Sequence, residues 1–122
     1  MSIHVVIPGP PVPKERPRRG ADGQWYTPQK TRDAEQSIAD YAIVQNRDAA
    51  PNAKARFHVD IHLYCKDFRF DLDNASKTAL DGLTKSGIVW KDDSQVDALY
   101  VLRIKADAAG ERTEIWIRAE LT

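Results

Sequence analysis

Two groups of acidic residues in the middle of the chain are the side chains best suited to chemistry. Asp71 and Asp73 stand two residues apart after an apolar stretch, and Asp92 and Asp93 follow about twenty residues later. Alternation along an extended strand would put the Asp71 and Asp73 carboxylates on one face. Like charges placed so closely raise one another's pKa unless a cation lies between them. The pattern therefore predicts a site for a hard divalent cation such as Mg2+, which takes oxygen ligands.

Lys77 and a third acid would complete this arrangement. Lys77 lies four residues beyond Asp73, so a helix over this segment would place both side chains on one face. Its ammonium group could then reach a phosphate or the leaving oxygen. One of Asp92 and Asp93 would supply the third carboxylate. These residue types together indicate phosphodiester chemistry.

A structural reading of the same acids is the alternative. Asp73 or Asn74 would cap a helix, and the second acidic pair would form a polar turn; for a bare Asp-x-Asp motif capping is the commoner role. A wider set of residues changes that weighting. It runs Asp71-x-Asp73-Asn74-x-x-Lys77-x-x-x-Asp81-x-Leu83, then Gly87, then Asp92-Asp93-x-Gln95-Val96. This pattern resembles the RusA family of Holliday junction resolvases, found in bacteria and their phages.

A second part of the resemblance lies near the amino end and is similar to phage-type members of the family. It consists of Gly9-Pro10-Pro11-Val12-Pro13-Lys14-x-Arg16-Pro17-Arg18 with Tyr26-Thr27-Pro28. The resemblance implies one endonuclease domain over residues 1–122, a homodimer that uses Mg2+, and no small-molecule cofactor, to resolve four-way DNA junctions by paired symmetric nicks. Carried over by position, it implies that Asp71, Asp73 and Asp93 are the metal-binding catalytic acids, Lys77 the catalytic lysine and Asp92 a reserve ligand.

Basic residues near the amino end are the predicted DNA contacts. Residues 1–32 carry six Lys and Arg against two acids, a balance of +4, whereas residues 71–97 carry three against six, a balance of −3. The whole chain has zero formal net charge, which is unusual for a DNA-binding domain. The segment from Pro8 to Gly23 is expected to be a loop that orders on a ligand or on the dimer partner. The predicted contacts to the DNA are Lys14, Arg16, Arg18 and Arg69.

Trp25 and Tyr26 follow this basic segment, and their role stays open. They could stack on an unpaired or distorted base beside the arginines. Alternatively, Trp25 is buried against the core, as aromatic residues usually are.

Length and composition describe one soluble domain. The 122 residues are 42% hydrophobic and 30% charged, which is typical of a globular protein. The single cysteine, Cys65, excludes an internal disulfide and a cysteine-based zinc site, and it fits a reducing cytoplasm. The amino end lacks the features of a signal peptide, and no apolar run approaches membrane-spanning length. We therefore expect a cytoplasmic protein without a membrane partner.

Apolar periodicity predicts an α+β (mixed α/β) fold, with a mixed sheet of about four strands packed against two main helices. Strands are expected over residues 3–7, 56–65, 98–105 and 112–121, the last two joined as a hairpin with a positive-φ glycine at Gly110. One helix is expected to begin near Pro28, capped by Thr27 or Thr31, and to end before Pro51. The other should run from about Asn74 to a left-handed cap at Gly87.

Two further functions remain open. A non-catalytic DNA-binding or structural module could keep the same fold, with its acids serving as caps and turns. A less selective Mg2+ nuclease could act on flaps or replication forks. Clustered acids would repel DNA without any gain to a pure binding module, so the pattern favours a nuclease.

Overall fold

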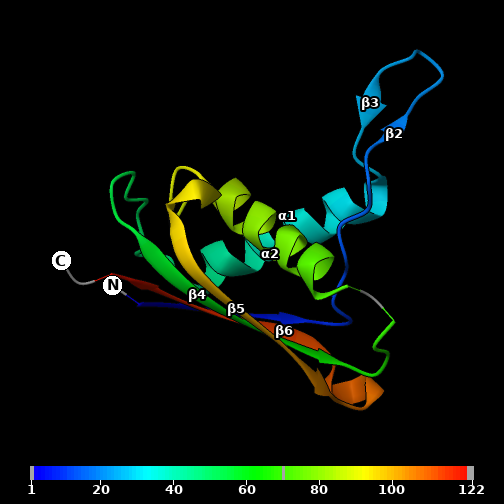
Figure 1. Ribbon diagram of the computed structural model, residues 1–122. Helices are drawn as coiled ribbons and strands as arrows, with labels where there is room; N and C mark the ends of the chain where they lie inside the picture. The colour runs from blue at the N-terminus through cyan, green and yellow to red at the C-terminus, as the bar shows by residue number, and fades with distance from the viewer. Residues whose placement is uncertain (1, 70, 121–122) are drawn as a thin grey trace.

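The predicted elements are largely present. The computed structural model describes residues 2–69 and 71–120, so Phe70 of the acidic motif and Leu121 of the last predicted strand lie outside the described residues. The elements are shown in Figure 1. In chain order they are β1 (Ser2–Pro8), β2 (Arg18–Arg19), β3 (Trp25–Tyr26), α1 (Gln29–Gln45), β4 (Phe57–Cys65), α2 (Leu72–Ser86), η1 (Asp93–Gln95), β5 (Val96–Lys105), η2 (Ala108–Gly110) and β6 (Arg112–Ala119).

The main sheet is mixed and four-stranded, as expected, with the strand order β1-β6-β4-β5. β5 runs parallel to β4, and the other neighbours are antiparallel. The predicted hairpin of the last two strands is wrong, because β4 lies between β5 and β6. The connection instead contains the 3-10 turn η2, whose Gly110 donates to the Asp107 carboxylate (2.9 Å) and has no positive φ. A local turn pattern could not show that the most buried strand, β4, takes a central position.

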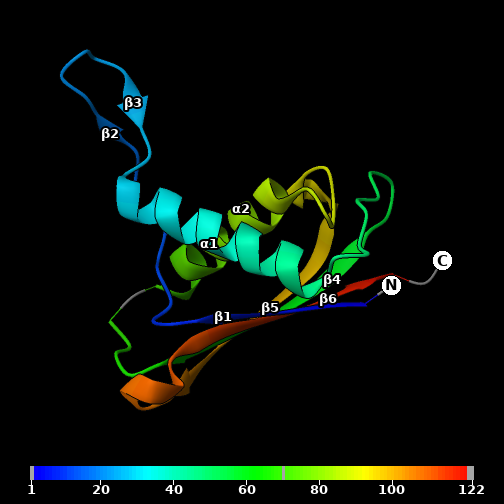
Figure 2. The same cartoon turned by 180° about the vertical axis from the view of Figure 1, so that it is seen from behind.

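Both helices pack against one face of this sheet (Figures 1 and 2). The β4 side chains alternate strictly, and every second one, from Phe57 to Cys65, is buried; those from Phe57 to Leu63 belong to the core that the helices share. α2 meets them with Ala75, Ala79 and Leu83, and its left-handed cap at Gly87 (φ 69°) is confirmed. Burial of these apolar side chains is the main stabilisation available to a domain of this size.

α1 begins without the expected threonine cap. Pro28 occupies the N-cap position, and no side chain caps the helix, so the predicted cap at Thr27 or Thr31 is wrong. Thr31 is fully buried, and its hydroxyl accepts a hydrogen bond from the Glu15 backbone amide (3.1 Å). The hydroxyl therefore anchors an earlier segment of the chain rather than the helix end.

The carboxyl end of α1 covers one edge of the sheet. The Gln45 amide accepts from the Val6 backbone N–H (2.7 Å) and donates to the Val6 carbonyl (2.8 Å). The Asn46 amide donates to the His4 carbonyl (3.1 Å). These bonds satisfy outward-facing groups of β1, so this edge is protected from pairing with another strand. β5 forms the opposite edge.

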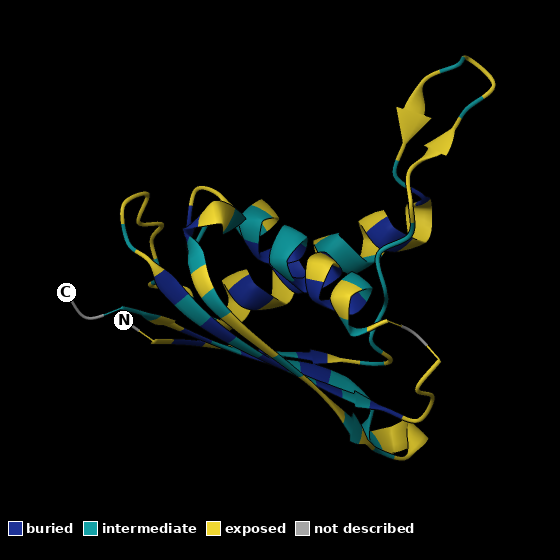
Figure 3. Ribbon diagram, in the orientation of Figure 1, coloured by how far each residue is buried: buried dark blue, intermediate teal, exposed yellow. Residues whose placement is uncertain are grey.

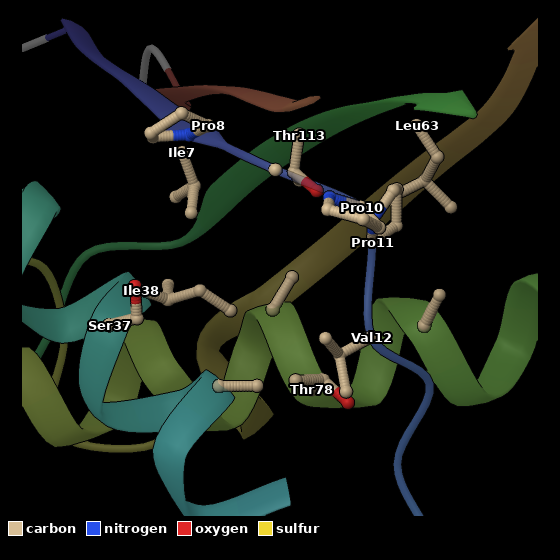
Figure 4. Close-up of a pocket in the computed structure, with 14 residues that line it drawn as sticks. Ile7, Pro8, Pro10, Pro11, Val12, Ser37, Ile38, Leu63, Thr78 and Thr113 are labelled. Atoms are coloured by element: carbon tan, nitrogen blue, oxygen red, sulfur yellow. The ribbon is translucent and has the colours of Figure 1, made fainter. Parts of the chain in front are cut away.

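The first half of the predicted Pro8–Gly23 loop is packed against the body of the protein. Residues 8–12 border a mostly apolar cavity of about 100 Å³, which is also lined by side chains that include Ile38, Leu63 and Thr78 (Figure 4). None of the described lining residues carries a charge. The second half contains β2 and the turn that leads to β3. That a ligand or the dimer partner orders this segment stays a prediction.

α2 packs closely against α1 at Gly82. A Cβ there would lie 2.7 Å from both Cβ and Cγ2 of Ile38 and 3.0 Å from the backbone oxygen of Glu35. We expect Gly82→Ala to lower the free energy of unfolding by about 1–3 kcal/mol, because the clash outweighs alanine's better helix propensity. Denaturant unfolding measures the change. An unaltered free energy of unfolding would show that the two helices can move apart here without loss of stability.

Candidate active site

The start of α2 separates the two acids of the first motif. Asp71 occupies the N-cap position in an extended conformation, and the helix begins at Leu72, so Asp73 lies in the first turn. The expectation that alternation puts both carboxylates on one strand face is wrong, because the chain becomes helical between them. The capping alternative fails as well: Asp73 and Asn74 lie inside the helix, and the Asp71 side chain makes no capping hydrogen bond.

Asp73, Lys77 and Asp93 line one open hollow between α2 and the start of β5. The Lys77 Nζ lies 3.9 Å from Asp73 Oδ2, and about two thirds of each of these two side chains is exposed. Three of the four predicted catalytic residues are thus brought together, whereas Asp71 is not among the lining residues. The remaining residues that line the hollow are Ser76, Leu80, Val96, Asp97 and Leu99.

A buried glutamine holds the turn that carries the second acidic pair. The Gln95 amide nitrogen donates to the backbone oxygens of Asn52 (2.7 Å) and Ala55 (2.9 Å). Its oxygen accepts from the backbone amides of Lys91 (2.9 Å) and Asp92 (3.3 Å). Sequence reasoning placed this glutamine in the family pattern but gave it no role. Its place in that pattern, between the second acidic pair and Val96, was the available signal.

The two acids of this pair do different things. Asp92 caps η1, and its Oδ2 accepts from the Ser94 backbone amide (3.2 Å). Hydrogen bonds from Ser94 stabilise the charged carboxylate of Asp92 and so lower its pKa. The role of this carboxylate is therefore structural. Asp93 is half-buried and faces the hollow. The polar-turn alternative therefore describes Asp92, and Asp93 is the acid that lies in the hollow.

The environment of Asp93 disfavours its charged form. Burial raises the pKa of Asp93 above the ordinary value of 3.8, and the negative charges of Asp92 and Asp81 raise it further, with Lys14 partly offsetting them. Asp97 lines the same hollow, but its charged form is favoured, because the hydrogen bond that it accepts from Arg56 lowers the pKa of its carboxyl. The unbalanced negative charge at Asp93 would be relieved by a bound cation.

These shifts predict opposite effects of two matched substitutions on stability without divalent metal. A raised folded-state pKa means that stability falls as pH rises from 3.8 through that pKa, so Asp93→Asn should raise the Tm at pH 7 but not below pH 3.8. A lowered pKa gives stability at neutral pH that is lost on acidification, so Asp97→Asn should lower the Tm at pH 7. Thermal unfolding at both pH values checks the pair, and shifts of the same sign would contradict it.

The carboxylates of the hollow fit Mg2+ by their chemistry. Asp73 and Asp93 offer only oxygen donors, and Mg2+ is commonly held by one or two carboxylates together with water and substrate phosphates. Within residues 2–69 and 71–120, no three side chains among His, Cys, Asp and Glu lie close enough to hold a metal ion together. That Asp71, Asp73 and Asp93 share one ion thus stays a prediction.

Lys14 is tied to both helices. Its backbone amide donates to the Asn74 carbonyl (2.9 Å), and its Nζ pairs with Asp81 and, at 3.7 Å, with Glu35. The hydrogen bond with Asp81 raises the pKa of Lys14, which therefore remains protonated at neutral pH. Its use as a DNA contact stays a prediction, and DNA phosphates would have to compete with these two carboxylates.

The predicted DNA-binding arginines are exposed and lie in different places. Arg16 adjoins the active-site hollow, since it lines a neighbouring depression together with Lys77. Arg18 lies on β2, 3.3 Å from the Glu15 carboxylate. Arg69 is 91% exposed, with its Nε 3.4 Å from Asp67. Exposed ion pairs of this kind are weak and can exchange for phosphate.

Together, the fold and the hollow define a class: a small α+β domain that presents carboxylates and an ammonium group where a phosphodiester could enter. The chain belongs to the RusA endodeoxyribonuclease family, because the family model described as "Endodeoxyribonuclease RusA" matches residues 8–118. The family resemblance of the two sequence motifs is thereby confirmed.

Two curated relatives align over almost the whole chain. The crossover junction endodeoxyribonuclease rusA of Enterobacteria phage 82 is 31% identical over 123 residues, which cover 95% of this chain and 93% of the relative. The crossover junction endodeoxyribonuclease RusA of Shigella sonnei (strain Ss046) is 32% identical over 120 residues, which cover 93% of this chain and 91% of the relative.

Neither helix in the described part of the chain is both long and apolar enough to cross a membrane.

Proposed function

We propose that this protein is a Mg2+-dependent endonuclease that resolves four-way DNA junctions by paired symmetric nicks in DNA recombination and repair. The observation that carries the proposal is the open hollow that Asp73, Lys77 and Asp93 line, in a chain of the RusA family. The names of the two relatives support a crossover junction as the substrate.

Asp73, Lys77 and Asp93 each have a role in this proposal. Asp73 and Asp93 hold the metal ion, with Asp71 as the predicted third carboxylate. When bound, Mg2+ supplies Lewis-acid polarisation of the scissile phosphate and lowers the pKa of a water. The exposed Lys77 ammonium stabilises negative charge that develops on the phosphate oxygens or on the leaving oxygen. Arg16, in the adjoining depression, contacts a neighbouring backbone phosphate and so positions the strand.

Cleavage of an end-labelled four-way junction beside a linear duplex of the same sequence tests the proposal. Paired symmetric nicks on the junction alone, present with Mg2+ and absent with EDTA, are expected. Equal cutting of the linear duplex would instead assign a general Mg2+ nuclease. Tight binding of the junction without cutting under any metal condition would assign a binding module.

A homodimer is the second part of the proposal, and the β5 edge supports it. β5 is ten residues long and, among the residues that the structure describes, has a hydrogen-bonded neighbour on one side only, while Leu99, Tyr100 and Leu102 are 40–60% exposed. Antiparallel pairing of two β5 strands about Val101 would place Tyr100 opposite Leu102 of the second copy. It would also place Asp97, which binds Arg56 of its own chain, opposite Lys105.

Such pairing would join the two active-site hollows through a twofold axis. β5 begins in the hollow, since Val96, Asp97 and Leu99 line it. Two hollows related by a twofold axis match the twofold symmetry of a four-way junction, which is what paired cuts require.

A charge placed on the β5 edge should separate the two copies. We expect Leu102→Lys to convert the dimer to a monomer in analytical ultracentrifugation, because two lysines would face an apolar contact. Val44→Lys is the matched control, since Val44 is an equally exposed apolar residue (56%) on α1. A wild-type monomer, or a dimer that survives Leu102→Lys, would contradict this interface.

A further inference from the structure

We propose that Trp25 stacks on a base face that is exposed at the branch point of the DNA, so that the arm formed by β2 and β3 favours branched over linear DNA. The arm is defined as residues 15–27. This inference rests on the proposed function, because it takes DNA as the substrate, but it concerns recognition and can be measured without cleavage.

The arm stands away from the body of the protein. In Figures 1 and 2 it projects beyond the end of α1, and in Figure 3 both of its strands are exposed. Trp25 is 69% exposed and Tyr26 47% exposed. The alternative that Trp25 is buried against the core is therefore wrong. An indole is a large apolar surface, and its position on a projecting arm leaves it accessible to a binding partner.

The tip of the arm is held by its own hydrogen bonds. The Gly20 amide donates to the Gln24 carbonyl (2.8 Å), and the Gly23 amide donates to the Gly20 carbonyl (3.0 Å). The Gln24 amide donates to the Asp22 carboxylate (3.0 Å), and Arg19 Nε donates to the Gly23 carbonyl (3.1 Å). Gly23 has a φ of 82°, which favours glycine. The arm thus presents Trp25 from a formed turn, which lowers the entropy lost on binding.

The root of the arm is attached beside the active site. The Glu15 amide donates to the buried Thr31 hydroxyl (3.1 Å), next to the bond from Lys14 to Asn74 of α2. Arg16 then shares a depression with Lys77. DNA that enters the hollow would therefore meet the base of the arm directly, and its branch point could reach the side chains further along.

The chemistry of the arm suits nucleic acid. The register pairs Arg18 with Tyr26 and Arg19 with Trp25, so each face of the hairpin carries one guanidinium and one aromatic ring. The two acids of the arm are engaged locally, Glu15 with Arg18 and Asp22 in the turn. Guanidinium groups bind phosphates, and an indole stacks on any base without reading its identity. A junction has such exposed base faces at its centre, whereas a continuous duplex does not.

Binding measurements with a four-way junction and a linear duplex of the same sequence test this inference. Fluorescence anisotropy in EDTA gives the Kd values, and 2-aminopurine at the branch point reports stacking. Trp25→Ala should weaken junction binding by about tenfold or more, the effect of losing one stacked base, and leave duplex binding unchanged. Trp25→Phe should keep most of the affinity and the 2-aminopurine signal. Tyr41→Ala, at an exposed aromatic residue on α1, is the control and should change neither.

Other outcomes would overturn the inference. Equal loss of junction and duplex affinity would make Trp25 a general DNA contact, and unchanged DNA binding with altered sedimentation would make the arm a protein interface. Failure of the wild type to bind either DNA would also reject it. A wild type that binds the junction through Trp25 but does not cut it with Mg2+ would reject the proposed catalytic function while supporting this inference.

Discussion

Asp73→Asn is expected to reduce the rate of junction cleavage at least about a thousandfold without unfolding the protein. The Asp73 side chain is 67% exposed, and its ion pair with Lys77 is long at 3.9 Å, so loss of its charge should change stability little. Asparagine keeps the size of the side chain but is a much weaker ligand for Mg2+ than a carboxylate. The loss should therefore appear in the chemical step.

Single-turnover cleavage and junction binding in EDTA separate the two effects. Binding should persist or strengthen, because removing a negative charge from a DNA-facing hollow lowers repulsion. Mg2+ should also raise the Tm of the wild type more than that of the variant, which reports metal binding without catalysis. Asp40→Asn, at an exposed acid on α1, should match the wild type. Full cleavage by Asp73→Asn would show that the metal ion binds elsewhere. Unfolding of the variant would show that this acid has a structural role.

The elements whose side chains alternate or recur regularly were predictable from the sequence. β4 is one example, because every second residue from Phe57 to Cys65 is apolar and the structure buries each of them. The close of α2 at Gly87 is another, because a left-handed residue is most easily a glycine. In both cases the physical cause acts within a few residues of the chain.

The relative placement of Asp71 and Asp73 was not predictable in the same way. The apolar alternation before them does not show at which residue the extended conformation ends, and the helix begins at Leu72, between the two acids. The pairing of β5 with β4 rather than β6 has a similar cause, because strand order depends on burial of the whole sheet. The arm shows the limit most clearly, since two strands of two residues have no periodicity to detect.

The support of Asp93 depends on contacts distant in sequence, which is why Gln95 had no predicted role. Its amide joins the turn after Trp90 to a segment about forty residues earlier, and each polar atom of the amide makes two hydrogen bonds. Only 6% of the residue is exposed, so water cannot replace these bonds easily. Gln95 therefore acts as a positioning residue for Asp93 in the proposed reaction.

Gln95→Ala should lower the free energy of unfolding by about 2–4 kcal/mol, because it leaves two backbone carbonyls and two amides without their partner. The folded fraction should also cleave the junction more slowly, since Asp93 loses its fixed position, while junction binding in EDTA is retained. Denaturant unfolding and single-turnover cleavage measure the two effects. Stability close to that of the wild type would mean that the turn is held by the Asp92 cap and not by this amide.

Gln95→Glu distinguishes loss of hydrogen bonds from loss of volume, because it keeps the size and shape of the side chain. One carboxylate oxygen can still accept from the Lys91 and Asp92 amides, but the other faces the Asn52 and Ala55 carbonyls without a proton to donate. Burial and these oxygens should raise the folded-state pKa of the new carboxyl above the usual value of about 4.3. Stability should therefore fall as pH rises through that range, so the deficit relative to wild type should be small at acid pH and large at pH 7. A deficit that does not vary with pH would show that the turn responds to packing around Gln95 and not to its hydrogen bonds.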